Sequence, residues 1–123
     1  MPQPNLIVRY VRSLAPSVAF YSELFGQKPV QSSPGFAMFA LPSGLMFGLW
    51  TYDAVKPPAK PSAGADEICL PAADASALET LHSEWRKRGV TIAQAPAELG
   101  FGLNFVALDP DGHRLRVIAQ AAS

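Results

Sequence analysis

The chain has 123 residues, and its ten basic and ten acidic side chains give a formal net charge of zero at pH 7. A neutral chain lacks the basic surface typical of nucleic-acid binding, and this length predicts one domain. The single cysteine, Cys69, excludes an internal disulfide and a zinc site built from cysteines. No charged leader precedes an apolar segment and no apolar run is long enough to span a membrane, so we expect a cytoplasmic protein without a nucleic-acid or membrane partner.

The first half of the chain, residues 5–52, predicts a strand, a helix and three further strands. An aliphatic run at 6–11 forms the first strand, and Ser13 is placed to cap a helix that ends at Gly26. Apolar residues recur at helical spacing between these two positions. Three strands are then expected at 28–31, 36–41 and 45–52, and a Pro-Ser-Gly turn joins the last two.

The second half, residues 66–119, repeats this order after a connector at 53–65 that contains three prolines. A strand is expected at 67–70, and a helix follows between a cap at Asp74 and a stop at Gly89. Strands are expected at 90–93, 103–108 and 114–119, with the turn Asp109-Pro110-Asp111-Gly112 between the last two. The predicted fold class is therefore α+β, with a βαβββ module that occurs twice.

Two motifs at the ends of this duplicated unit carry a resemblance to a known family. One comprises Val11-Arg12-Ser13-Leu14, Ser17-Val18-Ala19-Phe20-Tyr21 and Leu24-Phe25-Gly26, and the other runs from Phe105 to Leu115 through the Asp-Pro-Asp-Gly turn. Together they resemble the vicinal oxygen chelate superfamily, which includes glyoxalase I, bleomycin-resistance proteins and extradiol dioxygenases. The resemblance implies one domain over residues 1–123, in which two tandem modules form a curved half-barrel sheet around a cavity. It also implies a homodimer.

Enzymes of that superfamily hold a divalent metal at four positions, which the resemblance places at Leu6 or Asn5, Gly48, Glu67 and Arg116. Glu67 alone among these has a side chain that suits the metals involved, and the guanidinium of Arg116 carries a permanent positive charge. A catalytic metal site normally needs three protein ligands. We therefore expect no metal, no other cofactor and no catalytic residue, and we interpret His82 and His113 as structural or surface residues.

Strand alternation predicts which side chains share the cavity face with these positions. The candidate ligand-binding residues are Tyr10, Met46, Trp50, Tyr52, Glu67, Phe101, Arg114 and Arg116. Aromatic and apolar groups with a few polar ones suit a flat organic ligand. Core packing or a dimer contact explains Trp50 and Tyr52 nearly as well, and Phe36 and Phe39 are equally ambiguous. Phe101, between two glycines, is either a lid or the anchor of its loop.

Two further interpretations concern the predicted cavity floor. Glu67 and Arg116 are expected to form a buried ion pair in place of the metal, the alternative being that Arg116 extends into solvent and Glu67 stays hydrated. Cys69 is expected to be a small buried packing residue and not a nucleophile, because Glu67 on the same face raises its pKa.

Three functions are compatible with this pattern. The first, which we favour, is a non-metal binding protein of the bleomycin-resistance kind that sequesters a small hydrophobic or aromatic compound, such as an antibiotic. The second is a divalent-metal lyase or dioxygenase of the glyoxalase type with ligands at other positions. The third is a structural or regulatory dimer without a small ligand.

Overall fold

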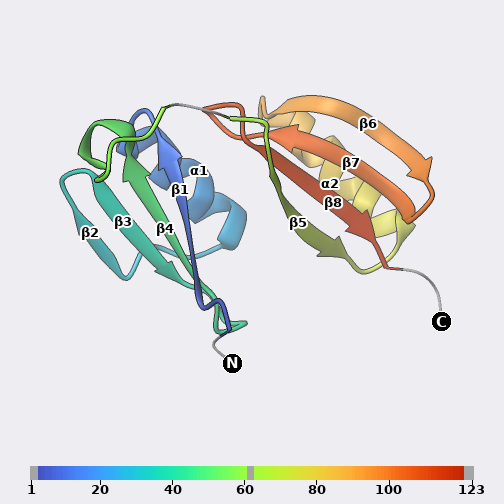
Figure 1. Ribbon diagram of the computed structural model, residues 1–123. Coiled ribbons are helices and arrows are strands. Elements are labelled where there is room, and N and C mark those ends of the chain that lie inside the picture. The colour runs from blue at the N-terminus through green and yellow to red at the C-terminus, as the bar shows by residue number, and fades with distance from the viewer. Residues whose placement is uncertain (1–2, 61–62, 121–123) are drawn as a thin grey trace. The chain divides into compact units, whose positions relative to one another are not determined.

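The computed structural model describes residues 3–60 and 63–120, and the chain divides into two compact units, Met1–Ser62 and Ala63–Ser123 (Figure 1). Each unit contains one four-stranded sheet and one α-helix. The order of strand, helix and three strands occurs in both. The predicted α+β class and the duplicated βαβββ module are confirmed.

Unit 1 is built around a sheet with the strand order β1-β4-β3-β2. Its elements are β1 (Leu6–Val11), α1 (Leu14–Phe25), β2 (Gln31–Ser33), β3 (Phe36–Ala40), β4 (Met46–Thr51) and a short 3-10 helix, η1 (Tyr52–Ala54). β1 runs parallel to its neighbour β4, and the other neighbours are antiparallel. The first and last strands of the unit are therefore hydrogen-bonded side by side.

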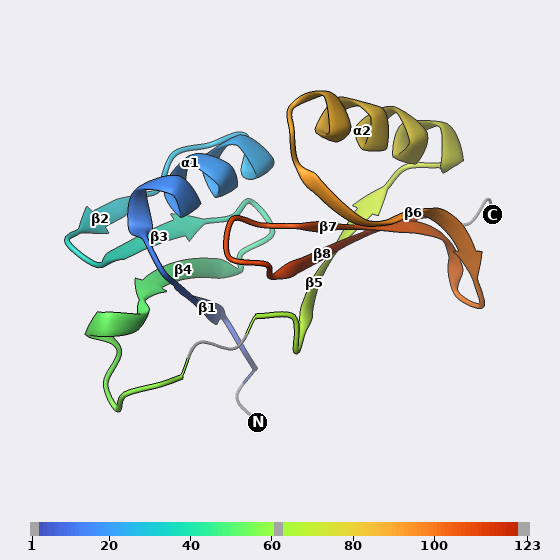
Figure 2. The ribbon, with the colours of Figure 1, turned by 90° about the horizontal axis from the view of Figure 1, so that it is seen from above.

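The core of unit 1 lies between α1 and one face of this sheet (Figure 2). Alternate strand residues point to this face, and Phe39, Phe47 and Leu49 are almost completely buried there. The ring of Tyr21 on α1 lies 4.9 Å from that of Phe47, centroid to centroid. Gly26 ends the helix in the left-handed conformation, with φ of 66°. The other face of the sheet, called here the open face of unit 1, carries the half-buried residues Val8, Tyr10, Phe36, Met38, Met46 and Trp50.

Unit 2 repeats this arrangement with the strand order β5-β8-β7-β6. Its elements are β5 (Glu67–Ala72), α2 (Ala75–Lys87), β6 (Thr91–Leu99), β7 (Gly102–Leu108) and β8 (Arg114–Ala119). The predicted cap is confirmed, because Asp74 Oδ1 accepts a hydrogen bond from the backbone N–H of Ala77 at 2.8 Å. β5 runs parallel to β8. The first and last strands are neighbours here too.

The core of unit 2 lies between α2 and one face of its sheet (Figure 2). Leu78, His82 and Trp85 on α2 are buried, and the rings of His82 and Trp85 lie 5.2 and 5.5 Å from that of Phe105. His113 is also buried, and its backbone N–H donates to Asp109 Oδ1 at 2.8 Å within the predicted turn. The face away from α2, called here the open face of unit 2, carries side chains of Glu67, Cys69, Asn104, Arg114 and Arg116.

Several predicted boundaries were wrong. The second strand lies at Gln31–Ser33, where polar residues gave no strand signal, and not at 28–31. β6 continues to Leu99, past Pro96, because a proline is tolerated on an edge strand where the register shifts. The strand expected at 45–52 ends at Thr51, and the connector begins packed on unit 1, since Val55 is buried.

None of the helices in the described parts of the chain is long and apolar enough to cross a membrane.

Candidate functional site

Three aromatic rings meet on the open face of unit 1. Trp50 is the register partner of both Tyr10 on β1 and Phe36 on β3. Its ring makes edge contacts with both, at a centroid distance of 6.3 Å in each pair and interplanar angles of 78° and 87°. All three residues are half-buried. The cluster presents a preformed aromatic surface, because each ring is held by a neighbouring strand.

Gly48, one of the four positions that the resemblance gave to metal ligands, lies beneath Phe36. A Cβ added at Gly48 would stand 3.2 Å from Phe36 Cζ, 3.3 Å from Phe36 Cε1 and 3.5 Å from Val8 Cγ2. The Phe36 ring therefore occupies the space that a side chain at this position would need. The sequence left Phe36 ambiguous, and the available signal was a glycine inside a strand, which often marks a close approach by another group.

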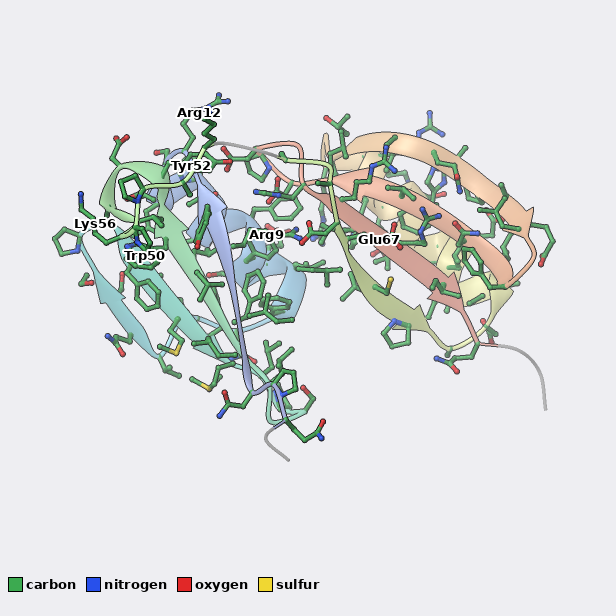
Figure 3. All side chains as sticks on the ribbon, viewed as in Figure 1. Arg9, Arg12, Trp50, Tyr52, Lys56 and Glu67 are labelled. Atoms are coloured by element: carbon green, nitrogen blue, oxygen red, sulfur yellow. The ribbon has the colours of Figure 1, made fainter. Side chains whose placement is uncertain are left out.

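The two remaining predicted site residues of unit 1, Met46 and Tyr52, lie in different elements. Met46 is half-buried on the open face, as strand alternation predicted. The same argument was wrong for Tyr52, which lies in η1 beyond the end of β4. Tyr52 follows the last residue of β4, at the end of the unit where β1 also terminates, and Figure 3 labels it there.

A hydrogen-bonded polar network lies on the open face of unit 2. Arg116 Nε donates to Glu67 Oε2 at 2.8 Å, and Arg116 Nη1 donates to Asn104 Oδ1 at 2.6 Å. The Arg116 side chain is 14% exposed and that of Glu67 is 33% exposed. The predicted ion pair is confirmed, but the expectation that both partners are buried was wrong for Glu67. Figure 3 shows Glu67 on β5.

Asn104 fixes the position of the arginine. Its side chain is fully buried. Its Oδ1 accepts from Gln94 Nε2 at 3.0 Å as well as from Arg116. Its Nδ2 donates to the carbonyl oxygens of Ala97 and Gly102 at 3.2 and 3.0 Å. Because both ends of the amide are engaged, its oxygen is held toward the guanidinium. Sequence reasoning missed Asn104, although a polar residue in the apolar run 103–108 was a visible signal.

Phe101 lies in the turn between β6 and β7 and is 57% exposed. Its ring centroid lies 5.7 Å from Cζ of Arg116, within the range of a cation–π contact. The ring thus covers one side of the guanidinium, a contact that neither sequence interpretation specified.

The charges of this network are set by its short contacts. The hydrogen bond from Arg116 lowers the pKa of Glu67 below its ordinary value, and the same bond raises the pKa of Arg116. Partial burial, followed by the hydrogen bond from Cys69 Sγ to Glu67 Oε2 at 3.3 Å, raises the pKa of the Cys69 thiol. At neutral pH the pair is ionised and the thiol is protonated. Cys69 is exposed, so the prediction of a buried packing residue was wrong.

The metal positions that the resemblance implies occupy equivalent places in the strand pairing of the two units. Glu67 is paired with Arg114 and Cys69 with Arg116, so Arg116 stands two residues beyond the partner of Glu67. In unit 1, Leu6 is paired with Met46 and Gly48 stands two residues further along β4. This shared offset agrees with the four positions that the resemblance assigned. Arg114, opposite Glu67, is exposed.

Comparison with known proteins identifies the family. Residues 3–117 match the family model described as the Glyoxalase/Bleomycin resistance protein/Dioxygenase superfamily. The chain belongs to this superfamily. Among curated proteins, the phenazine antibiotic resistance protein EhpR of Enterobacter agglomerans is 29% identical over 117 residues, which cover 93% of this chain and 89% of that protein.

Two solved structures have the same fold. A protein from Agrobacterium tumefaciens, determined by solution NMR, is 38% identical with a TM-score of 0.91, over 99% of this chain and 100% of that chain. A glyoxalase-related enzyme from Fulvimarina pelagi is 20% identical with a TM-score of 0.83, over 98% of this chain and 89% of that chain. At that level of identity the second match shows the fold alone.

The residues at the superfamily's metal positions do not fit a divalent metal. In unit 1, Leu6 has no donor atom and the Phe36 ring fills the space above Gly48. In unit 2, the carboxylate of Glu67 is already bound by a guanidinium, and Arg116 would repel a cation. Within the ranges 3–60 and 63–120, no group of three or more His, Cys, Asp or Glu side chains is placed to hold a metal ion.

Proposed function

We propose that this protein binds and sequesters a small planar aromatic compound of the phenazine antibiotic type, without a metal and without converting it chemically. The observation that carries the proposal is the aromatic cluster of Tyr10, Phe36 and Trp50, whose central ring contacts both neighbours at 6.3 Å. Phe36 takes the space of a lost ligand position at Gly48. An aromatic surface replaces a metal ligand there, and planar heteroaromatic compounds stack on such surfaces.

The resistance protein EhpR supports the choice of compound, since its name refers to phenazine antibiotics and its similarity extends over 93% of this chain. The proposed contacts are given for each unit by itself. On the open face of unit 1 they are Tyr10, Met46 and Trp50, as predicted from the sequence, with Phe36 added. On the open face of unit 2 the proposed contacts are the polar groups of Glu67 and Arg116 and the apolar ring of Phe101. We also propose the homodimer and the cytoplasmic location that the sequence led us to expect. Static light scattering at micromolar concentration tests the dimer, and a monomer mass would contradict it.

Titration with phenazine tests the binding function. We expect saturable binding with a fixed stoichiometry by isothermal titration calorimetry, and quenching of tryptophan fluorescence. Trp50→Ala should weaken binding about tenfold or more, because stacking on one aromatic side chain is worth roughly 1–3 kcal/mol. Trp85→Phe is the matched control, since Trp85 packs against Phe105 in the core of unit 2. This variant should still bind phenazine, and its remaining tryptophan signal should still be quenched.

Two measurements separate sequestration from enzymatic chemistry. Mass spectrometry of phenazine after incubation should recover it unchanged, with and without added nickel, zinc or manganese. Elemental analysis of the purified protein should find no stoichiometric divalent metal. Conversion of the compound, or tight one-to-one metal binding with turnover, would overturn the proposal, as would the absence of saturable binding.

A further inference from the structure

Arg116 retains hydrogen-bond donors that its known partners do not use. A guanidinium carries five N–H donors in a fixed plane. Nε donates to Glu67 and Nη1 to Asn104, whereas Nη2 makes no hydrogen bond to any residue that the structure describes. Phe101 covers one side of the guanidinium, and the side chain is 14% exposed. The Nη2 group is therefore a donor in a restricted environment, held in a defined place.

The surroundings of this donor are close to electrically neutral. The Glu67 carboxylate lies 2.8 Å from Arg116 Nε and balances its charge. The Cys69 thiol, which donates to the same carboxylate oxygen, is uncharged at neutral pH. Arg114 is exposed, so solvent and salt screen its charge. A ligand group that meets Nη2 thus meets a fixed donor beside an already neutralised cation.

We propose that the Glu67–Arg116 pair makes this protein selective for planar heteroaromatic ligands that carry a neutral hydrogen-bond acceptor, such as an amide carbonyl, over the same ligands with a carboxylate. This inference rests on the proposed function and specifies its ligand class. A neutral carbonyl accepts from Nη2 and leaves the ion pair intact. A carboxylate loses its hydration there, and Glu67 repels it, so little attraction to Arg116 remains to offset that cost.

Three probes of the same ring system test this selectivity: phenazine, phenazine-1-carboxamide and phenazine-1-carboxylate, titrated at pH 7.5 and fixed ionic strength. In the wild-type protein we expect the carboxamide to bind about tenfold more tightly than the carboxylate, which is the effect of one useful hydrogen bond and one unfavourable charge. The carboxamide should also bind more tightly than phenazine itself.

The variant Glu67→Gln provides the decisive comparison. Its loss of one negative charge leaves Arg116 uncompensated, so the carboxylate should gain affinity relative to the carboxamide by about tenfold or more. Glu67→Asp keeps the charge and should keep the wild-type order of affinities. Arg86→Gln is the matched control: it removes one positive charge from the exposed last turn of α2 and should leave the ratio of the two dissociation constants within about twofold of the wild-type value.

The outcomes separate this inference from the function on which it rests. Phenazine binding with tighter binding of the carboxylate in the wild-type protein, or with a ratio unchanged in Glu67→Gln, would overturn the selectivity and leave the proposed function standing. A ratio that changes equally in Arg86→Gln would also overturn it, because the selectivity would then belong to the general charge of unit 2. Failure of all three probes to bind would overturn both.

Discussion

Replacement of Arg116 by alanine measures how much the polar network of unit 2 stabilises the fold. The change removes the hydrogen bond to buried Asn104, the partly exposed ion pair with Glu67 and the contact with Phe101. A hydrogen bond to a buried amide contributes about 1 kcal/mol, and the ion pair and the ring contact each contribute about 0.5 kcal/mol. We therefore expect the free energy of unfolding to fall by about 2 kcal/mol.

This loss is smaller than the roughly 3 kcal/mol expected when one partner of a fully buried pair is removed. The reason is the 33% exposure of the Glu67 side chain, which allows water to solvate the carboxylate after its partner is lost. Asn104 Oδ1 also keeps its bond from Gln94, so no buried acceptor is left without a partner. Both effects limit the penalty.

Urea denaturation at pH 7 measures this difference, with Arg114→Ala as the matched control. Arg114 lies on the same strand and on the same face but is exposed, so its replacement should change the stability by no more than about 0.5 kcal/mol. Equal losses in the two variants would refute the reasoning, because they would assign the effect to general charge and not to the network. Arg116→Lys should fall between, since an ammonium group cannot reproduce the planar arrangement of donors.

Three further predictions follow from the same contacts. Because Arg116 lowers the pKa of Glu67 below its ordinary value of 4.5, the stability that this carboxylate supplies is present above pH 4.5 and is lost as the pH falls through the lowered value. Wild-type and Glu67→Gln stabilities should therefore differ at pH 7 and converge in acid, and a constant gap in thermal unfolding from pH 7 to pH 3 would contradict this. Glu67→Gln should also increase the rate of Cys69 alkylation by iodoacetamide at pH 7.5 severalfold. Glu67 raises the pKa of the thiol, so its removal increases the thiolate fraction. An unchanged rate would show that burial alone raises that pKa. Gly48→Ala should displace the Phe36 ring and reduce the free energy of unfolding by about 1 kcal/mol. The double variant with Phe36→Leu should lose less than the sum of the single changes, while Gly100→Ala, which meets no atom within 4 Å, serves as the neutral control.

The order of the elements was predictable because it depends on local signals. The end of α1 at Gly26 and the cap of α2 at Asp74 both follow from backbone chemistry that acts within one turn. The ion pair was also predictable, since placing Glu67 and Arg116 on one face required only strand alternation and the resemblance. Each of these inferences needed only a few physical steps.

The parts of the site that were not predictable depend on contacts between distant segments. Asn104 is held by the Ala97 carbonyl oxygen and the Gln94 side chain of β6, a strand whose register shifts near Pro96, and neither the shift nor the length of that strand is encoded locally. The place of the Phe36 ring over Gly48 depends on the pairing of β3 with β4. The strand bound at Tyr52 was wrong for the opposite reason, because a local turn into η1 ends the alternation at Thr51.

The two units differ in the residues that they place at the superfamily's metal positions. Leu6 and Gly48 in unit 1 are uncharged, and the Phe36 ring lies against Gly48. Unit 2 retains the carboxylate of Glu67, and a second carboxylate at position 116 would repel it unless a cation lay between them. Arginine at this position supplies the missing positive charge through the protein itself. The ion pair therefore couples the two residues. Either one, changed alone, leaves its partner without this counter-charge, whereas changing both to neutral residues does not.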